Sequence, residues 1–394
     1  MKFNRYRMED VLEYIIDYRG KTPQKSEKGV LTLSAKSVRD GYIDYNQCYC
    51  ISKEEYARFM VRGFPQIGDV LLTTEAPLGV TARLDRGDVA VAQRLLTLRG
   101  KEKVLDTGYL YYYLRSPLGQ GKLRERQTGT TVVGIKQAEF RKIEIDLPDI
   151  ETQRKVTSIL SSIDDKIRVN KKINENLEQQ AQAYFQNLFI DNANSEWVQG
   201  TISDLGTVVG GSTPSKSKPE YYTKDGIAWI TPKDLSINKA KFISHGENDI
   251  TELGLKNSSA SVMPEGTVLF SSRAPIGYIA ITSGKVTTNQ GFKSVVPKPE
   301  IGTAFVYYFL KYNLPIIEGM ASGSTFKEVS GSTMKNVPAG IPDTKTLGFF
   351  RDFCAPIFAQ QKILEEQNQS LSALRDSLLP KLMSGEINVS DIWF

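Results

Sequence analysis

Few residues in this 394-residue chain have the types and spacing that catalysis needs. The single histidine, His245, cannot build a histidine cluster, and no Pro-Pro pair exists to grip a flipped adenine for methylation. A Gly-x-x-x-x-Gly-Lys-Ser/Thr loop for nucleotide phosphates is also missing from the sequence. The carboxylate pairs Asp164–Asp165 and Glu365–Glu366 leave a metal-dependent nuclease as an alternative, but they fall in helical segments, where a solvated face is the simpler interpretation. We therefore expect a chain that binds without catalysing a reaction.

The cysteines and the composition favour a folded protein of a reducing compartment. Cys48 and Cys50 stand two residues apart with no second pair downstream, and Cys354 is isolated, so we expect neither disulfides nor a metal site. No stretch approaches the roughly 18 apolar residues of a membrane span, and residues 1–10 lack the apolar core of a signal peptide. We expect a cytoplasmic protein without membrane contact. The net charge of +5 permits a phosphate-binding surface but does not require one.

The elements that position the polar residues occur twice along the chain. Glycine, proline and hydroxyl residues recur in the same order in residues 1–190 and 191–394. The matched positions are Gly20, Thr22 and Pro23 with Gly211, Thr213 and Pro214; Ser34 and Lys36 with Thr231 and Lys233; Gly68, Ala76, Pro77 and Gly79 with Gly266, Ala274, Pro275 and Gly277; Gln93 with Gln290; and Gly129 and Thr131 with Gly323 and Thr325. A period of roughly 195 residues is far longer than that of solenoid repeats, so it indicates duplication of a whole domain with its following helix.

Each copy combines short strands with an aromatic helix. β-branched runs such as Val70–Thr73 and Val268–Ser271 alternate with turn residues, while Tyr109–Arg115 and Phe305–Tyr312 have helical character. The expected fold class is α+β. It consists of two similar mixed α/β domains, at residues 1–150 and 191–348, related by a pseudo-twofold axis.

A long helix is predicted after each copy, in residues 151–190 and 349–394. Apolar residues in both follow the 3-4 spacing of a coiled coil, so we expect the two helices to pair antiparallel and to separate the domains. Asn170, Asn174 and Asn368 fall on this seam, where asparagine lowers stability but fixes register, and we expect them to set the pairing. An amphipathic helix lying on its own domain is the alternative for either helix taken singly.

The sequence resembles the specificity subunits of Type I restriction–modification systems over essentially the whole chain. The resemblance rests on motifs in a fixed order, within the duplicated layout. These motifs are Gly211-Ser-Thr-Pro214, Trp229-Ile-Thr-Pro-Lys-Asp-Leu235, Ser271-Ser-Arg-Ala-Pro-Ile-Gly277, Asn289-Gln290 and Leu378-Leu-Pro-Lys-Leu-Met-Ser-Gly-Glu386. Each motif alone is mostly turn chemistry, so their order carries the argument.

The resemblance implies that each copy is a target recognition domain reading one half of a split site in double-stranded DNA. The paired helices would set the spacing between the halves and dock the partners. These partners are two modification (methyltransferase) subunits and restriction subunits. S-adenosylmethionine, Mg²⁺ and ATP would belong to the partner subunits, and none of them to this chain.

Under this resemblance, DNA contacts are expected from polar residues in the matched loops, because base edges and phosphates are bound by such groups. Turn formation is the alternative role for many of them. In the first domain the candidates are Ser34, Lys36, Thr73, Thr74, Glu75, Gln93, Arg94, Thr130 and Thr131. In the second they are Thr231, Lys233, Ser271, Ser272, Arg273, Asn289, Gln290, Ser324, Thr325 and Lys327.

Arg273 is the only arginine between Asp191 and Gly348, and its counterpart in the first copy is Glu75. Arginine suits guanine and glutamate can accept from cytosine, so the two halves are expected to read different bases, with an internal salt bridge of Arg273 as the alternative. A coiled-coil interaction protein with duplicated protein- or glycan-binding domains is the competing function. Salt-dependent DNA binding would separate the two functions.

Overall fold

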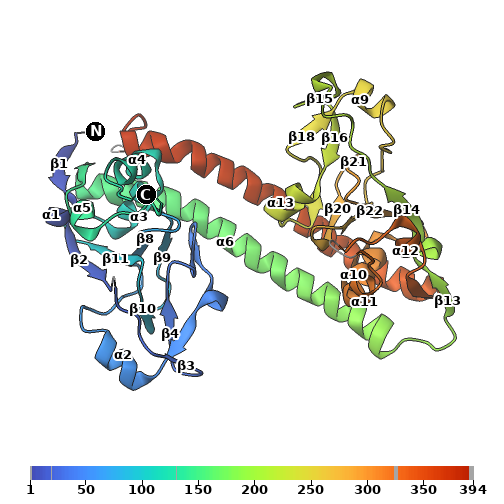
Figure 1. Cartoon of the computed structure of the whole chain (residues 1–394), viewed down its shortest axis with the longest axis horizontal. Helices are drawn as coiled ribbons and strands as arrows, with labels where there is room; N and C mark the ends of the chain where they lie inside the picture. Colours follow the sequence, from blue (N-terminus) through green and yellow to red (C-terminus); the bar gives the residue numbers. More distant parts are fainter. Residues whose placement is uncertain (1, 19, 130, 324–326, 390–394) are drawn as a thin grey trace. The chain divides into compact units, whose positions relative to one another are not determined.

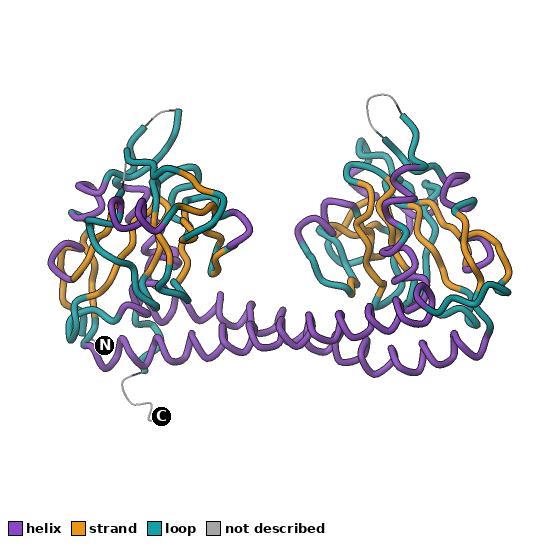
Figure 2. Tube along the Cα trace, turned by 90° about the horizontal axis from the view of Figure 1, so that it is seen from below, coloured by secondary structure: helices purple, strands orange, loops and turns teal. Residues whose placement is uncertain are grey.

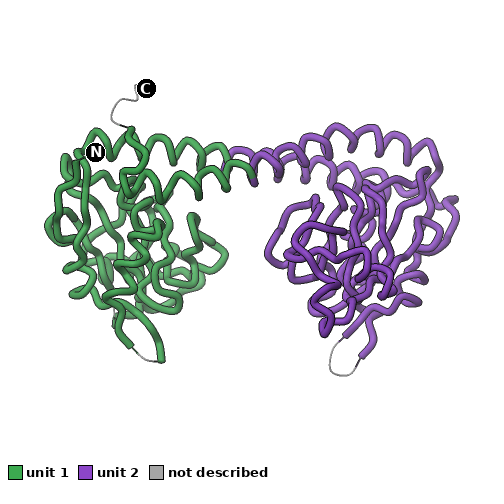
Figure 3. The backbone as a smooth tube through the Cα atoms, turned by 90° about the horizontal axis from the view of Figure 1, so that it is seen from above, with its two compact units in different colours: residues 1–167, 370–394 green, residues 168–369 purple. Residues whose placement is uncertain are grey.

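The computed structural model describes residues 2–18, 20–129, 131–323 and 327–389. The chain forms two compact units, drawn in different colours in Figure 3. Unit 1 contains Met1–Ile167 and Ser370–Phe394, and unit 2 contains Arg168–Gln369. The sequence had suggested helical segments separate from the domains, whereas each unit here includes a stretch of both long helices.

The described part of unit 1 contains two four-stranded sheets and two two-stranded pairs (Figure 1). The first sheet has the order β2 (Leu12–Asp17), β11 (Leu95–Gly100), β8 (Val70–Thr73) and β9 (Thr81–Arg83). The second has the order β10 (Val89–Val91), β4 (Val30–Leu33), β7 (Tyr49–Ile51) and β3 (Lys25–Ser26). One pair joins β1 (Asn4–Arg7) to β12 (Glu144–Leu147), and in the other β5 (Val38–Arg39) pairs with β6 (Tyr42–Ile43). The helices are α1 (Met8–Val11), η1 (Tyr45–Gln47), α2 (Lys53–Phe59), α3 (Thr107–Arg115), α4 (Pro117–Glu125) and α5 (Gln137–Arg141).

Unit 2 repeats this plan. Its larger sheet has the order β14 (Gly206–Gly210), β22 (Lys293–Pro297), β19 (Val268–Ser272), β20 (Ile276–Thr282) and β17 (Phe242–Ile243). Its smaller sheet has the order β15 (Tyr222–Thr223), β18 (Asn248–Ile250), β16 (Ile227–Ile230) and β21 (Thr287–Thr288), and β13 (Val198–Thr201) pairs with β23 (Pro338–Ile341). The helices are α7 (Ile202–Leu205), η3 (Pro219–Tyr221), α8 (Pro232–Ile237), α9 (Glu252–Lys256), α10 (Thr303–Tyr312), α11 (Leu314–Gly319) and α12 (Gly331–Lys335).

The two units share strand order and strand direction, which confirms the predicted duplication. In each, the strand before the matched proline (β8 or β19) pairs antiparallel with both of its neighbours. In each smaller sheet one parallel pair, β10 with β4 or β21 with β16, occupies the matching place. The predicted mixed α/β domains are therefore present twice.

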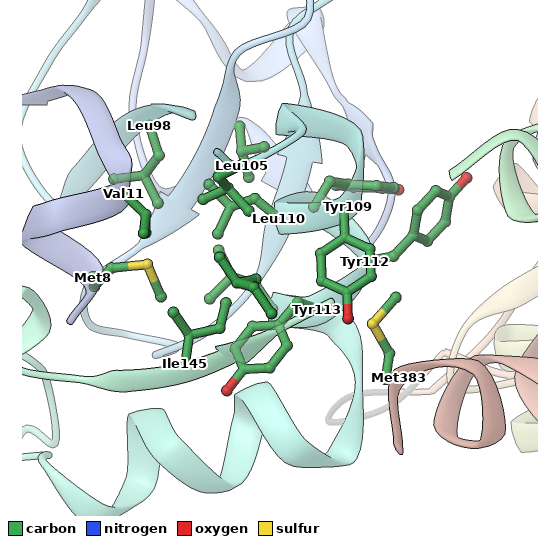
Figure 4. Close-up of a cluster of buried hydrophobic side chains, with 14 of the residues drawn as sticks. Met8, Val11, Leu98, Leu105, Tyr109, Leu110, Tyr112, Tyr113, Ile145 and Met383 are labelled. Carbon is green, nitrogen blue, oxygen red and sulfur yellow. The ribbon is translucent and has the colours of Figure 1, made fainter. Parts of the chain in front are cut away.

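The aromatic helices form the centre of each core. Asp106 caps α3 by accepting a hydrogen bond from Tyr109 N, and every residue from Gly108 to Leu114 is buried. In Figure 4, Tyr109, Tyr112 and Tyr113 extend from α3 into a cluster that also contains Met383 of the last helix. In unit 2, α10 is buried in the same way from Ala304 to Leu310. Burial of these large rings in the two cores stabilises both units.

Two long helices, α6 (Ile150–Gln186) and α13 (Thr344–Ser384), contribute to both cores, and a π-helical turn (Asn187–Asp191) ends the first of them. In unit 2, Asn170 contacts Asn368 while Asn174 contacts Gln361, so residue numbers rise along one helix as they fall along the other. In unit 1, Asp164 accepts a hydrogen bond from Arg375 at 2.9 Å. Within each unit the helical stretches lie side by side, as Figure 2 shows, and in unit 2 they run antiparallel as expected.

Within the described residues, no helix combines the length and the apolar character that crossing a membrane demands.

Candidate nucleic-acid interface

A loop with the same construction follows strand β8 in unit 1 and β19 in unit 2. Each loop has an alanine with positive φ, Ala76 at 50° or Ala274 at 48°, followed by a cis proline. In unit 1 the Thr73 hydroxyl donates to Pro77 O at 2.6 Å and accepts from Val80 N at 2.9 Å. These two hydrogen bonds fasten both ends of the loop to the strand.

In unit 2 a serine performs the same task. The Ser271 hydroxyl donates to Pro275 O at 2.9 Å and accepts from Tyr278 N at 2.7 Å. Thr73, Thr74, Ser271 and Ser272 are all buried. These four residues were expected to contact DNA, but they lie beneath the surface, where Thr73 and Ser271 fasten the loops and Ser272 donates to Gly291 O at 3.1 Å, so we no longer include them in the candidate interface.

In unit 2 the loop borders a cleft of about 660 Å³. Five residues selected from the sequence line this cleft together: Thr231, Lys233, Arg273, Asn289 and Gln290. They come from the start of α8, from the loop after β19 and from the turn after β21, which are far apart in the chain. The five residues selected by aligning the two repeats are therefore neighbours in the folded unit.

Ion pairs hold Lys233 and Arg273 in this cleft. Lys233 pairs with Glu247 at 2.6 Å, and the hydrogen bond between them raises the pKa of Lys233. Arg273 lies 3.5 Å from Glu328, and Lys293 lies 3.6 Å from the same carboxylate. The salt bridge that the sequence left open as an alternative for Arg273 is therefore present.

The neutral side chains of the cleft also take part in local structure. Thr231 begins α8 in a capping box, in which the Asp234 carboxylate accepts from Thr231 N at 2.7 Å and from the Thr231 hydroxyl at 2.6 Å. Asn289 accepts from Gly291 N at 2.9 Å, and Gln290 accepts from Thr213. Turn formation and exposure to a ligand are thus combined in these residues.

Some residues of the cleft were not among the DNA-contact candidates chosen from the sequence. The cleft is also lined by Lys216, Tyr222, Trp229, Glu247 and Asn248. Trp229 donates from its ring nitrogen to Ser212 O at 3.0 Å and meets the Tyr222 ring edge-on, with centroids 5.7 Å apart. Lys216 and Tyr222 lie in the segment that follows the Gly-Ser-Thr-Pro motif, so extending that motif by ten residues would have found them.

In unit 1 the corresponding polar residues are arranged differently. Arg94 pairs with Glu75 at 2.8 Å, and Gln93 donates to Thr22 at 3.0 Å. Ser34 is half-buried and its backbone N–H donates to Ser37 at 3.0 Å, while Lys36 is exposed. Arg94 has a φ of 68°, a backbone conformation that residues other than glycine rarely adopt.

A second hollow of about 480 Å³ lies beside the cis-proline loop of unit 1. It is lined by Pro77, Gln120, Arg124, Thr131 and Val132, among others. Thr131 is the sequence candidate that faces this hollow. In unit 2, Lys327 is exposed. The remaining candidates, Thr130, Ser324 and Thr325, lie outside the residues that the structure describes.

Comparison with known proteins places this geometry in context. The sequence model of the Type I restriction modification DNA specificity domain matches twice, at residues 2–179 and 194–374. The MjaIX specificity subunit of a Type I restriction enzyme from Methanocaldococcus jannaschii is 41% identical over 180 residues, which cover 43% of this chain and 41% of that subunit. This chain therefore spans less than half of the length of that relative. A putative specificity subunit, MjaX, from the same organism is 23% identical, covering 97% of this chain and 93% of its own.

The crystal structure of the Type I restriction–modification S subunit from M. genitalium has the same fold. It superposes with a TM-score of 0.64 at 16% identity and covers 97% of this chain and 96% of the other. At that identity the likeness shows the fold alone.

Proposed function

Because this chain belongs to the family of Type I restriction–modification DNA specificity domains, we propose that it is the DNA-recognition subunit of such a complex. Each unit reads one half of a bipartite site in double-stranded DNA. The single observation that carries the proposal is the cleft of unit 2, where five polar residues chosen from the sequence lie together.

The chemistry of the cleft suits a base edge and its flanking phosphates. The guanidinium of Arg273 offers a fork of donors that matches guanine O6 and N7, and the Asn289 and Gln290 side chains offer a donor and an acceptor each. Lys233 is more exposed and offers a point charge, which suits a phosphate. In unit 1, Arg94, which pairs with Glu75, offers the corresponding guanidinium.

The long helices have a second role in this proposal, because they set the gap between the half-sites and dock the partner subunits. Val169 and Ile173 on α6 are one helical turn apart, and both are exposed. Ile363 on α13 is exposed as well. Apolar side chains of this kind on a helix favour burial against another protein, here the two modification subunits. Restriction subunits would join through that assembly.

Catalysis is assigned to these partners. S-adenosylmethionine, Mg²⁺ and ATP would be bound by the modification and restriction subunits, and this chain would supply the address on DNA. The complex would act in the cytoplasm, where it meets double-stranded DNA.

Methylation of a library of random DNA sites tests the proposal. The purified chain alone should leave the library unmethylated and uncut, and adding the modification subunits should give methylation at sites with two conserved halves and a fixed gap. Activity of the pure chain would refute the non-catalytic assignment. Methylation without sequence preference would refute the recognition role and favour a general interaction protein.

A further inference from the structure

Each cis-proline loop carries an ion pair, and the two units build that pair with exchanged charges. In unit 1 the loop supplies the acid, Glu75, which pairs with Arg94 at 2.8 Å. In unit 2 the loop supplies the base, Arg273, which lies 3.5 Å from Glu328. The same place in the fold therefore holds a carboxylate and a guanidinium in both units, contributed by different segments.

Backbone hydrogen bonds show that these positions correspond. Thr74 donates its N–H to Arg94 O at 3.0 Å, and its carbonyl accepts from Ile135 N at 2.9 Å. In unit 2, Ser272 donates its N–H to Gly291 O at 2.8 Å, and its carbonyl accepts from Val329 N at 2.9 Å.

These two sets of hydrogen bonds show which positions of the two units correspond to the charged partners. Arg94 in unit 1 corresponds to Gly291 in unit 2, and Gly134, just before Ile135, corresponds to Glu328, just before Val329. Each charged partner is thus replaced by a glycine at the matching position of the other unit.

These glycines fit the exchange of charges. A Cβ at Gly134 would lie 2.8 Å from Thr74 O and 3.0 Å from Glu75 Cβ, so that position cannot carry an acid while Glu75 keeps its place. A Cβ at Gly291 would lie 2.9 Å from Pro232 Cγ, which leaves no room for an arginine there. Each unit has one way to build the pair.

We propose that Glu75 and Glu328 are specificity-determining residues that restrain the neighbouring arginine until it meets the right base. This inference rests on the proposed DNA-recognition function. The Arg94 side chain is 54% exposed and that of Arg273 39% exposed, so either arginine alone would attract any phosphate. The carboxylate competes with phosphate for the same guanidinium.

The strength of these ion pairs decides how the carboxylate and DNA compete for the arginine. A half-exposed pair of this kind contributes little to stability, so DNA can break it. A phosphate of unrelated DNA replaces one bidentate anion by another with little gain, whereas at the target the guanine O6 and N7 acceptors add to the other base contacts of the half-site. The carboxylate therefore weakens binding to unrelated DNA more than binding to the target.

The test compares Glu328→Gln and Glu75→Gln with the unaltered chain, each assembled with the modification subunits. Affinity is measured for the target selected from the random library and for a short duplex of unrelated sequence, over a range of salt concentrations. Glu265→Gln is the matched control, because it also removes one carboxylate from an ion pair, with Lys362 at 3.0 Å. Glu265 precedes β19, whereas the cis-proline loop follows that strand, so the control lies at the opposite end of the strand.

Either substitution should raise affinity for the unrelated duplex about threefold to fivefold. The plot of log affinity against log salt should steepen by about 1, the value of one added phosphate contact. Affinity for the target should change less, so the ratio of target to unrelated binding falls. The Glu265→Gln control should leave both affinities unchanged.

Two results would overturn the inference. One is unchanged affinity for the unrelated duplex in both variants. The other is weaker target binding without a rise on the unrelated duplex, which is the result expected if the carboxylates contact bases directly. If the unaltered complex selects no sequence from the library, the proposed function fails, yet the unrelated duplex still decides whether the carboxylate restrains the arginine.

Discussion

The side-chain amide of Asn170 donates a hydrogen bond to the side-chain oxygen of Asn368 at 3.0 Å, in the seam between α6 and α13. Asn170 is fully buried, and its own side-chain oxygen has no partner among the described residues. A buried polar pair of this kind lowers stability and fixes one alignment of two helices. In unit 2 this asparagine pair therefore fixes the register of α6 against α13.

Replacing both asparagines by leucine is expected to raise the Tm and to permit more than one alignment of the helices, because apolar seam residues pack in several registers. Thermal unfolding measures the first effect, and the number of oligomeric species in light scattering measures the second. A lower Tm for the double variant would show that the pair stabilises the fold instead.

Glu178 of α6 pairs with two lysines of unit 2. It accepts from Lys241 at 2.5 Å and Lys311 at 2.6 Å, and Lys241 is buried. Glu178→Gln is expected to destabilise the chain by about 3 kcal/mol, because it leaves a buried ammonium without its counter-charge. Urea unfolding measures this loss, and Glu175→Gln, at an exposed position on the same helix, is the control.

The same carboxylate predicts how stability depends on pH. Burial alone would raise the pKa of Glu178, but the charges of Lys241 and Lys311 outweigh burial and lower it to about 2. A pKa below the unfolded value of about 4.3 means that the stabilisation is present above that pH and is lost as the pH falls from about 4.3 towards 2. The difference in unfolding free energy between the unaltered chain and Glu178→Gln should therefore shrink below pH 4. A constant difference down to pH 2 would contradict the assignment.

Arg273→Ala is expected to weaken discrimination at one base pair of the second half-site by about 1 to 3 kcal/mol, because a bidentate contact with guanine is lost. Preferences in the first half-site should stay as they are, since Arg273 belongs to unit 2 alone. Methylation across the random library reports both halves at once. A changed preference in both half-sites would show that the units do not read independently.

Lys233→Ala is expected to weaken binding evenly across sequences, because a lysine on a phosphate carries no base information. Titration of target and unrelated duplexes should show equal losses. A loss confined to the target would place Lys233 on a base edge.

Lengthening the helices by four residues, roughly 6 Å, is expected to widen the tolerated gap between half-sites by one or two base pairs without changing either half. The insertion belongs in both α6 and α13, because each stretch of one helix packs on the other within its unit. The random library again measures the gap. Altered half-site sequences in the lengthened variant would reject the independent action of helices and loops.

Much of the fold was predictable because turn and core residues act locally. The aromatic runs that form α3 and α10, the matched prolines and the asparagines of the seam were all found from spacing and residue type. Their roles depend on near neighbours or on a strict period, which a sequence displays directly.

The charged partners were less accessible to sequence reasoning. Glu328 meets Arg273 although 54 residues lie between them in the chain, and the buried place of Lys241 depends on side chains from three helices, α6, α10 and α13. The burial of Thr73 and Ser271 was missed because their residue types suit an exposed contact and a loop fastener equally well. Such long-range pairings carry no period, so only the folded chain shows them.

The core of unit 1 includes Leu160 from α6 together with Leu379, Leu382 and Met383 from the last helix. A ribosome makes these segments far apart in time, with all of unit 2 emerging between them. Unit 1 therefore cannot complete its core until residues 379–383 have been made, whereas unit 2, which is one continuous stretch, has its whole sequence available before them.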